Sequence, residues 1–514
     1  MKQKLLSNCF YLIILGVLSS FSLPPYNFFW INFFTYSLFF IILFKNLGII
    51  QNRKIYFFYG WLFGFGFFLS SLYWISISLT FDDNFKFLIP FVVILIPSFL
   101  ALFYGLICYF FFIFKLKKIL SSLFLFSLLF GLLEYIRGII LSGFPWNLIV
   151  YSLSEKLNLI SIVSIIGSYS LNLIVITIFT LPSIFILKIS KKNILVGIFL
   201  LSLPFFFSLY GLNYKKNFFD QNLTQNSIII RAINSNINID KFYGSYPVET
   251  VIRDLIKFSD PDKDKKIFFL WPEGIIPNTS KDELYLYEDL FKKRFNENHL
   301  IGLGINNKKI NNKKEVYYNS FSIFDHQINL IKYYNKLNLV PFGEFLPLEN
   351  FLTKIGFKSL TNNYQSYSKG KKREVIKIDI NSLSFKFIPL ICYEIIYSGS
   401  ISETNEFDFI LNISEDGWFG RSIGPKQHFI HSIFRSIETG KYIIRSANNG
   451  ITAIINPIGI VEKKLGDGVN GFVDFEERRN IKSTIFSIYG NKIFGFIILL
   501  YIFLIISFNR IKNE

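Results

Sequence analysis

The sequence predicts a multi-span α-helical membrane region joined to one large α/β domain, and three observations carry this prediction. First, 51% of the 514 residues are hydrophobic and the mean hydropathy is +0.40, which is too apolar for a water-soluble protein of this length. Second, long apolar runs fill the beginning of the chain and recur once near its end. Third, short β-rich runs alternate with polar segments in between. We therefore predict a transmembrane region at 1–213, an α/β domain at 214–487, and a final helix with a short tail at 488–514.

The apolar runs are long enough to cross a bilayer, which takes about 20 helical residues. We place spans near residues 5–22, 28–44, 56–79, 87–114, 119–141, 158–187, 193–212 and 489–508. The first run resembles a secretory signal because Lys2 and Lys4 precede it, but no small-residue cleavage site follows. We expect it to remain as an uncleaved helix.

Basic residues predict the orientation of these spans, because cytoplasmic loops are enriched in Lys and Arg. On every second connection the chain carries Lys2, Lys4, Lys45, Arg53, Lys54, Lys115, Lys117, Lys118, Lys188, Lys191, Lys192, Arg510 and Lys512. The alternate short loops hold mainly Lys86 and Lys156. Both termini are thus expected in the cytoplasm and residues 214–487 outside. We attribute the net charge of +18 to topology signals and solvated faces, and expect no nucleic-acid partner.

One pair of opposite charges interrupts the fifth span. Glu134 and Arg137 are three residues apart, so a helix places them on one face where they can neutralise each other. A lone charge within the bilayer would be costly. The pair is either a structural ion pair that fixes helix packing or a direct contact to substrate.

The domain at 214–487 contains ten short runs that are typical of β-strands. They lie at 227–232, 267–271, 300–305, 316–324, 328–334, 375–380, 383–391, 409–413, 442–445 and 451–455. Their alternation with polar, helix-compatible stretches indicates a layered domain whose core is filled by two sheets. The sequence shows neither a zinc-type spacing of Cys and His nor a complete glycine-rich phosphate loop.

Three of these runs end on residues that together suit acyl transfer through a thioester. Glu273 follows one run, Lys336 follows another, and Cys392 ends a third. They supply a base for the thiol proton, a fixed cation for an oxyanion, and a soft nucleophile. A lone cysteine is more often a core residue and a lone lysine a solvated one, so the prediction depends on the three occurring together.

Longer motifs surround these three residues. They are Trp271-Pro272-Glu273, Tyr334-Asn335-Lys336, Val340-Pro341-Phe342-Gly343-Glu344, Cys392-Tyr393-Glu394, Asp416-Gly417-Trp418-Phe419-Gly420, Gly424-Pro425-x-Gln427-His428 and Arg445-Ser446-x-Asn448-Asn449-Gly450. The order of Glu, Lys and Cys resembles the nitrilase (carbon–nitrogen hydrolase) superfamily. The whole series, with spans before and after the domain, resembles the apolipoprotein N-acyltransferase family within it. The family pattern predicts asparagine at position 415, and this chain departs from it with Glu415.

The resemblance implies an αββα nitrilase-like sandwich inserted between transmembrane helices 7 and 8. It implies transfer of a fatty acyl group from a phospholipid donor to the N-terminal α-amino group of a diacylglyceryl-apolipoprotein at the bacterial inner membrane. In that reaction Glu273 would be the general base, Lys336 the oxyanion-stabilising cation and Cys392 the acyl carrier. Glu344, Tyr393 and Glu394 would support the site. Neither a cofactor nor a metal is expected.

A thioester must be protected from water, so we expect the cleft to face the lipid bilayer and to be covered. Apolar loop residues are candidates for binding substrate there: Phe345, Leu346, Trp418 and Phe419. The first stretch continues through Leu348 to Phe351, Leu352 and Ile355, and ordinary core packing is an equally good interpretation of it.

Two other classes of protein compete with this interpretation. A membrane-tethered amidase or nitrilase-type hydrolase would keep the same three residues but use water as the acceptor. A transporter would explain the spans but not the three residues, and it would carry several polar groups or broken helices near the membrane midplane. Only Glu134 and Arg137 meet that description in the sequence.

Overall fold

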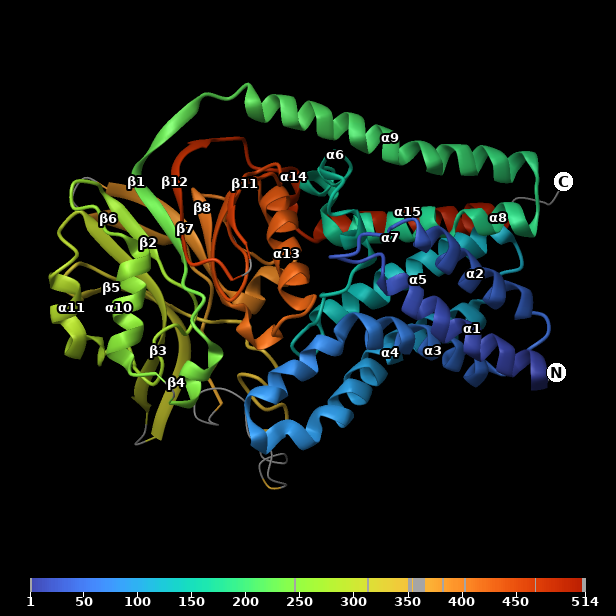
Figure 1. The fold of residues 1–514 in the computed structure, drawn as a ribbon. Helices are drawn as coiled ribbons and strands as arrows, with labels where there is room; N and C mark the ends of the chain where they lie inside the picture. The colour runs from blue at the N-terminus through green and yellow to red at the C-terminus, as the bar shows by residue number, and fades with distance from the viewer. Residues whose placement is uncertain are drawn as a thin grey trace. The chain divides into compact units, whose positions relative to one another are not determined.

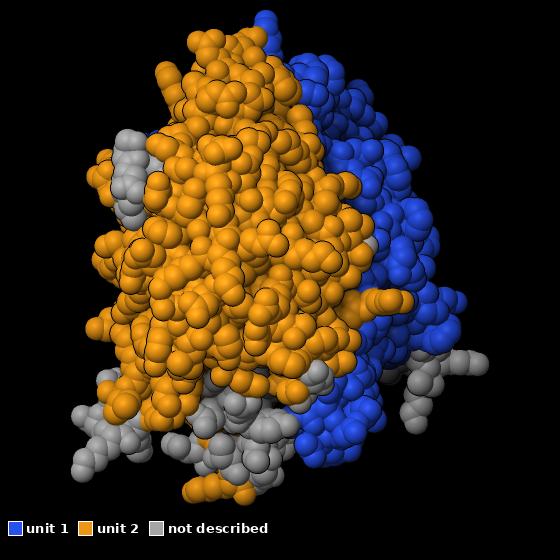
Figure 2. Space-filling model, turned by 60° about the vertical axis from the view of Figure 1, so that its left-hand side comes forward, with its two compact units in different colours: residues 1–216, 422–430, 484–514 blue, residues 217–421, 431–483 orange. Residues whose placement is uncertain are grey.

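The chain forms two compact units, which are coloured separately in Figure 2. The computed structural model describes residues 2–244, 246–311, 314–349, 354, 366–380, 383–401, 404–466 and 468–510. The helical unit comprises residues 1–216, 422–430 and 484–514, and the α/β unit comprises residues 217–421 and 431–483.

The helical unit is built from the apolar runs, because a helix satisfies its backbone polar groups internally where no water can. Its main helices are α1 (Lys2–Ser20), α2 (Ile31–Asn46), α3 (Arg53–Leu72), α4 (Ile89–Phe114), α5 (Ile119–Ile139), α7 (Val163–Thr180), α8 (Pro182–Leu187), α9 (Lys191–Phe219) and α15 (Lys492–Arg510), drawn in Figure 1. Among the described residues, six helical segments are long and apolar enough to cross a membrane, and shorter apolar helices lie at Ser7–Ser20 and Ile31–Asn46.

Two of the predicted spans are interrupted in the structure. The run predicted at 56–79 leaves the α-helical conformation after Leu72 and continues as a 3-10 helix, η1 (Tyr73–Phe81). The run predicted at 158–187 is divided into α6 (Leu157–Ile160), α7 and α8. Gly167 adopts φ = 75° inside α7, and Pro182, which has no backbone N–H, begins α8. Hydropathy could not reveal these breaks, because apolar residues continue across them.

Close helix packing places the Glu134–Arg137 pair in the interior of the helical unit. A Cβ atom at Gly60 of α3 would lie 2.1 Å from the carbonyl oxygen of Tyr104 in α4, so only glycine permits this approach. The Tyr104 hydroxyl donates to Glu134 Oε1 at 2.7 Å, and Arg137 Nε donates to Glu134 Oε2 at 2.8 Å. Both residues of the pair are 2% exposed. The predicted ion pair is confirmed, and its burial favours the structural role.

Helices α9 and α15 turn large apolar side chains outward. Phe199 and Leu195 on α9 are 63% and 68% exposed, and Phe503 on α15 is 64% exposed. Apolar surface of this extent is unfavourable in water and is suited to contact with lipid tails. These helices give the protein the character of a membrane protein.

The α/β unit contains two six-stranded sheets. The first has the order β12-β1-β2-β3-β4-β5 and consists of β1 (Leu223–Asn234), β2 (Ile267–Leu270), β3 (His299–Asn311), β4 (Lys314–Phe324), β5 (Leu330–Asn335) and β12 (Gly471–Arg479). The second has the order β11-β10-β9-β8-β7-β6 and consists of β6 (Ile376–Ile380), β7 (Leu383–Ile391), β8 (Phe409–Glu415), β9 (Tyr442–Asn448), β10 (Thr452–Ile455) and β11 (Val461–Leu465). All ten predicted strands occur, and β11 and β12 were not predicted.

Aromatic side chains fill the space between the two sheets. The ring of Phe268 on β2 lies 6.0 Å from that of Phe385 and 6.2 Å from that of Phe387, both on β7. The amphipathic helix α10 (Val248–Ser259) joins a core cluster with strands β1 to β3 through Ile252 and Leu255. On the second sheet, α13 (Gly424–Thr439) packs near the turn between β10 and β11. Helices thus cover the outer faces of two stacked sheets, as predicted for the αββα layering (Figure 1).

The central strands of both sheets are parallel, and this arrangement positions the site. Strands β1, β2 and β3 run parallel in one sheet, and β7, β8 and β9 do so in the other. In such sheets functional side chains gather beyond the carboxyl ends of the strands. Glu273 lies beyond β2, Cys392 follows β7 directly, and Glu415 ends β8.

Candidate active site

Cys392 stands at an abrupt junction between a buried strand and a turn. β7 ends at Ile391, and Cys392 begins the 3-10 helix η8 (Cys392–Ile396) with φ = 46°. A residue with a side chain seldom adopts this left-handed conformation, which is held only where the surroundings enforce it. Glu394 contributes to that enforcement by accepting a hydrogen bond from the backbone N–H of Ile391 at 2.9 Å.

Both carboxylate oxygens of Glu273 are held by hydrogen bonds. Oε1 accepts from Asn319 Nδ2 at 2.7 Å and from Lys336 Nζ at 2.9 Å. Oε2 accepts from the backbone N–H of Glu415 at 3.0 Å. The side chain is therefore fixed in one orientation while remaining an acceptor for a further proton.

Lys336 is a buried cation held between two carboxylates. Its Nζ lies 2.9 Å from Glu273 Oε1 and 3.0 Å from Glu344 Oε1, and its side chain is 1% exposed. Burial alone would lower the pKa of Lys336, but Glu273 and Glu344 raise it well above its usual value. Lys336 therefore keeps a positive charge at neutral pH. Burial raises the pKa of Glu344, against the opposing effect of Lys336.

The electrostatic surroundings of Cys392 keep its thiol protonated at rest. Burial and the carboxylate of Glu273 raise the pKa of Cys392 well above its usual value, while the charge of Lys336 opposes this shift. The thiol is thus near enough to both residues for their charges to act on it. The structure brings Glu273, Lys336 and Cys392 together, and the thiol needs a base to become a nucleophile.

Glu394 links the segment of Lys336 to the turn of Cys392. Its Oε1 accepts from the Tyr334 hydroxyl at 2.7 Å and from the backbone N–H of Leu337 at 2.8 Å, while its Oε2 accepts from Ile391. Arg373 Nη2 also donates to Oε1 at 2.9 Å. Burial would raise the pKa of Glu394, but Arg373 and these hydrogen bonds lower it. Glu394 is therefore a buried anion.

The remaining predicted residues lie on neighbouring loops. Tyr393 directly follows Cys392 and is 5% exposed, with its ring 5.5 Å from that of Tyr397. Trp418 and Phe419 belong to η9 (Asp416–Phe419) and are half-buried. The Trp418 ring stacks on that of Phe242 at 5.5 Å.

The predicted apolar loop after Glu344 has mixed exposure. Phe345 is half-buried, Leu346 is 5% exposed and Leu348 is 80% exposed. Leu346 therefore packs inward and Leu348 is presented outward. The rest of the predicted stretch, Phe351, Leu352 and Ile355, falls outside the described residues.

Asn319 and Lys241 are part of this site and were not recognised from the sequence. The Asn319 amide donates to Glu273 Oε1 at 2.7 Å and to Glu344 Oε1 at 2.6 Å, so it bridges two carboxylates. Lys241 forms a fully buried ion pair with Glu415. A polar amide at a buried position of a predicted strand was a signal in the sequence that could have identified Asn319. The sequence held no such signal for Lys241, because it lies far from Glu415 along the chain.

Comparison with known proteins identifies both parts of the chain. Residues 15–181 match the family model "Apolipoprotein N-acyltransferase N-terminal domain", and residues 294–473 match the model "Carbon-nitrogen hydrolase". The solved structure of Nit3 from Saccharomyces cerevisiae, a member of branch 10 of the nitrilase superfamily, matches with 17% identity and a TM-score of 0.33, over 49% of this chain and 90% of that one.

Curated relatives match nearly the whole chain. An apolipoprotein N-acyltransferase of Rickettsia prowazekii is 34% identical over 493 residues, which is 93% of this chain and 94% of the relative. One from Rhodopseudomonas palustris is 30% identical over 500 residues, which is 93% of this chain and 91% of the relative. With a nitrilase-like fold, several apolar helices and these relatives, the chain belongs to the apolipoprotein N-acyltransferase family of bacterial membrane acyltransferases.

Proposed function

We propose that this protein transfers a fatty acyl group from a membrane phospholipid to the N-terminal α-amino group of diacylglyceryl-cysteine in apolipoproteins, through a thioester on Cys392. One observation carries the proposal. Glu273 and Lys336 are in direct contact at 2.9 Å, and both act electrostatically on the Cys392 thiol. A base, a fixed cation and a nucleophile thus share one buried site.

In the first half-reaction Glu273 accepts the thiol proton as Cys392 Sγ attacks the ester carbonyl carbon of the phospholipid. The carbonyl oxygen becomes an oxyanion, and the charge of Lys336 stabilises it. When the intermediate collapses, the carbon–oxygen ester bond breaks. The leaving alkoxide takes the proton back from Glu273 and departs as a lysophospholipid, which leaves the acyl group on sulfur.

In the second half-reaction the lipoprotein amine attacks the thioester carbonyl carbon. Glu273 now accepts a proton from the amine, and Lys336 again stabilises the oxyanion. The carbon–sulfur bond breaks, the thiolate takes the proton from Glu273, and the product is an amide with a regenerated thiol. Glu344 and Glu394 orient Lys336 and Cys392 and need not touch the substrates.

We further propose that residues 214–487 form the extracytoplasmic catalytic domain between transmembrane helices 7 and 8, with both termini in the cytoplasm. The alternation of basic residues between connections supports this topology. Cysteine labelling with a reagent that cannot cross the membrane tests it. A Lys265→Cys variant should react from outside and a Gly48→Cys variant should not; the opposite pattern would show an inverted topology.

Single-turnover kinetics test the reaction. Purified enzyme mixed with phospholipid alone should release lysophospholipid in an amount roughly equal to enzyme, and then stop until a diacylglyceryl-apolipoprotein is added. The intact mass of the protein should rise by one acyl group at Cys392. Continuous release without an acceptor would instead support a hydrolase. Release that requires both substrates together would exclude a free acyl-enzyme.

A further inference from the structure

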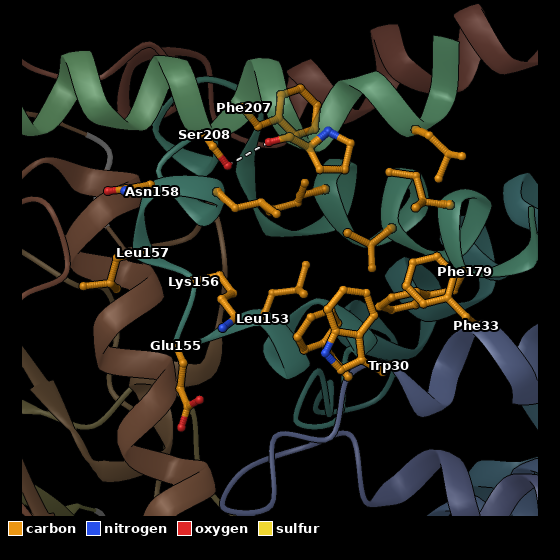
Figure 3. A pocket seen from close by; sticks show the side chains of 17 residues that line it. Trp30, Phe33, Leu153, Glu155, Lys156, Leu157, Asn158, Phe179, Phe207 and Ser208 are labelled. Carbon is orange, nitrogen blue, oxygen red and sulfur yellow. Dashed lines mark hydrogen bonds between the residues drawn. The ribbon is translucent and has the colours of Figure 1, made fainter. Parts of the chain in front are cut away.

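An apolar pocket of about 570 Å³ lies entirely within the helical unit (Figure 3). Its walls come from the segment before α2, the loop that precedes α7, and helices α7 and α9. Phe33, Phe179 and Phe207 contribute apolar side chains. The volume falls within the range of about 300–1,000 Å³ that is common for ligand sites in proteins. None of the candidate catalytic residues lines it.

Lys156 gives one end of this pocket a positive charge. In Figure 3 Lys156 lies at the edge of the pocket, whereas the carboxylate of Glu155 points away from it. Glu155 accepts a hydrogen bond from Asn27 at 2.8 Å, and the Lys156 ammonium lies 5.8 Å from the centre of the Phe29 ring. Trp30, 70% exposed, lines the same pocket. Lysine and tryptophan beside an apolar surface are typical of the boundary between lipid tails and head groups.

We propose that this pocket binds one phospholipid molecule, with an acyl chain along the apolar wall and its phosphate at Lys156. The occupant must be apolar along most of its length and anionic at one end, because the pocket combines a long apolar wall with a single cation. Exposed Leu201 leaves the wall accessible from the lipid side of α9. The proposal concerns binding alone and does not depend on the proposed reaction.

Native mass spectrometry of the full-length protein in detergent tests this binding with phosphatidylglycerol, a diacylglycerol with the same chains, and the free fatty acid. The wild-type protein should retain one phosphatidylglycerol and little of the other two. Lys156→Met should reduce its retention about fivefold, the scale of one lysine interacting with lipid phosphate. Lys86→Met is the matched control, since Lys86 is the other basic residue of these short loops and is paired with Asp83.

A second variant, Leu201→Trp, fills the pocket from its exposed side without removing any charge, and should also reduce retention. Melting curves of each variant show whether the fold is retained. Equal retention of diacylglycerol or fatty acid would overturn the phosphate contact. Retention that neither Lys156→Met nor Leu201→Trp reduces would show that the lipid is bound elsewhere as general annular lipid.

An independent observation concerns the buried Lys241–Glu415 pair beside Glu273. Lys241, on the 3-10 helix η4 (Ile239–Tyr243), is 0% exposed and Glu415 is 1% exposed. Asn448 Nδ2 donates to Glu415 Oε2 at 2.8 Å, and the backbone N–H of Glu415 donates to Glu273 Oε2 at 3.0 Å. Glu273, the proposed base, thus has Glu415 and Lys241 close by in addition to Glu344 and Lys336.

We infer that Lys241 is a positioning residue that offsets the charge of Glu415 beside the carboxylate of Glu273. This inference rests on the proposed role of Glu273 as the base. The charged and titratable groups that act around Glu273 are Lys336, Glu344, Cys392, Tyr367, Lys241 and Glu415. Among these described groups two lysines face two carboxyl groups; burial lowers the pKa of Lys241 and raises the pKa of Glu415, and each of the two opposes the shift of the other. Removing Lys241 leaves one carboxylate unpaired beside the base.

The pH–rate profile of lysophospholipid release tests this balance. Lys241→Met should move the acidic limb to higher pH by about 1 unit, because no cation then offsets the charge of Glu415 beside the proposed base. Glu415→Gln should move it to lower pH, and the double variant should return close to the wild-type profile. If the variants lose rate equally at all pH values and the acidic limb of the profile does not move, the Lys241–Glu415 pair has only a structural role. Absence of release by the wild-type enzyme would instead refute the proposed function.

Discussion

The hydroxyl of Tyr334 donates a hydrogen bond to the carboxylate of Glu394 at 2.7 Å, in the interior of the α/β unit. Tyr334 lies two residues before Lys336, and Glu394 lies two residues after Cys392. This bond therefore helps to hold the segment of the proposed cation against the turn of the proposed nucleophile. Because the Glu394 carboxylate also accepts hydrogen bonds from Arg373 and from three backbone N–H groups, replacing it should disturb several contacts together.

Glu394→Gln should weaken the fold and the reaction together. The amide cannot pair with the Arg373 charge, and leaving one partner of a buried ion pair alone costs about 3 kcal/mol or more. Unfolding of the purified protein in denaturant should show this loss. Glu476→Gln removes a carboxylate whose side chain is 47% exposed and should change stability little. Equal effects of the two substitutions would contradict the role assigned to Glu394.

Cys392→Ser should fold but form no acyl-enzyme. A hydroxyl is a poorer nucleophile at neutral pH, and a serine ester transfers its acyl group to an amine less readily than a thioester. The intact mass after incubation with phospholipid is the measurement. Cys9→Ala and Cys108→Ala are controls, since both residues lie on apolar helices, and they should acquire the acyl group normally. Robust turnover by Cys392→Ser would refute the thioester.

Lys336→Met should cost about 3 kcal/mol of transition-state stabilisation, the scale of losing an oxyanion-hole donor. That loss corresponds to a reduction of more than about 100-fold in the rate of acyl-enzyme formation. Lys332→Met, an exposed position on the strand β5 that directly precedes Lys336, should leave the rate unchanged. If both variants behave alike, the charge of Lys336 does not act on the reaction.

Alkylation of Cys392 should reveal a thiol that is neutral at rest. Burial and Glu273 raise the pKa of Cys392, so the folded protein binds the thiol proton more tightly than the unfolded chain, where the pKa is about 8.5. In a Cys9→Ala/Cys108→Ala background, the iodoacetamide rate should still be rising above that pH in the folded protein. The stabilisation from this group is full at lower pH and is lost as pH rises above about 8.5.

A rate of alkylation that is already constant at pH 7 would show a stored thiolate and remove the need for Glu273 as its base. The unfolded protein is the matched control, because its thiol should titrate near the ordinary value. The comparison uses one sequence in two states, so differences in intrinsic reactivity between variants do not enter.

The sequence revealed β2, β7 and β8, which end at the site, because these strands are largely buried and apolar, whereas β5 before Lys336 is largely exposed. β7 and β8 read as continuous β-rich runs, which is typical of strands covered on both faces. The strand β11 contains Glu462, Lys463 and Lys464 among its five residues, and was missed for the opposite reason. Both β11 and β12 are edge strands, where charged side chains face water and discourage pairing with other chains.

The helix breaks and the buried pairs could not be predicted from local patterns. A glycine within an apolar run gives no sign that it will adopt φ = 75°, as Gly167 does. Lys241 is likewise an ordinary polar residue in the sequence, and only the fold places it against Glu415. The proposed catalytic residues could be singled out in the sequence because each directly follows or ends a β-rich run, whereas the charged groups beside them come from distant segments.

Strand β12 pairs antiparallel with β1, and Leu223 lies opposite Arg479 in that register. The outer edge of β1, the first strand of the α/β unit, is therefore paired only after β12, the last strand, has formed. During synthesis β1 emerges long before β12, so its unpaired N–H and C=O groups stay open to other strands until the end of the unit has been made. A chain that stops short of residue 471 would therefore carry all of the proposed catalytic residues on a sheet with an exposed, association-prone edge.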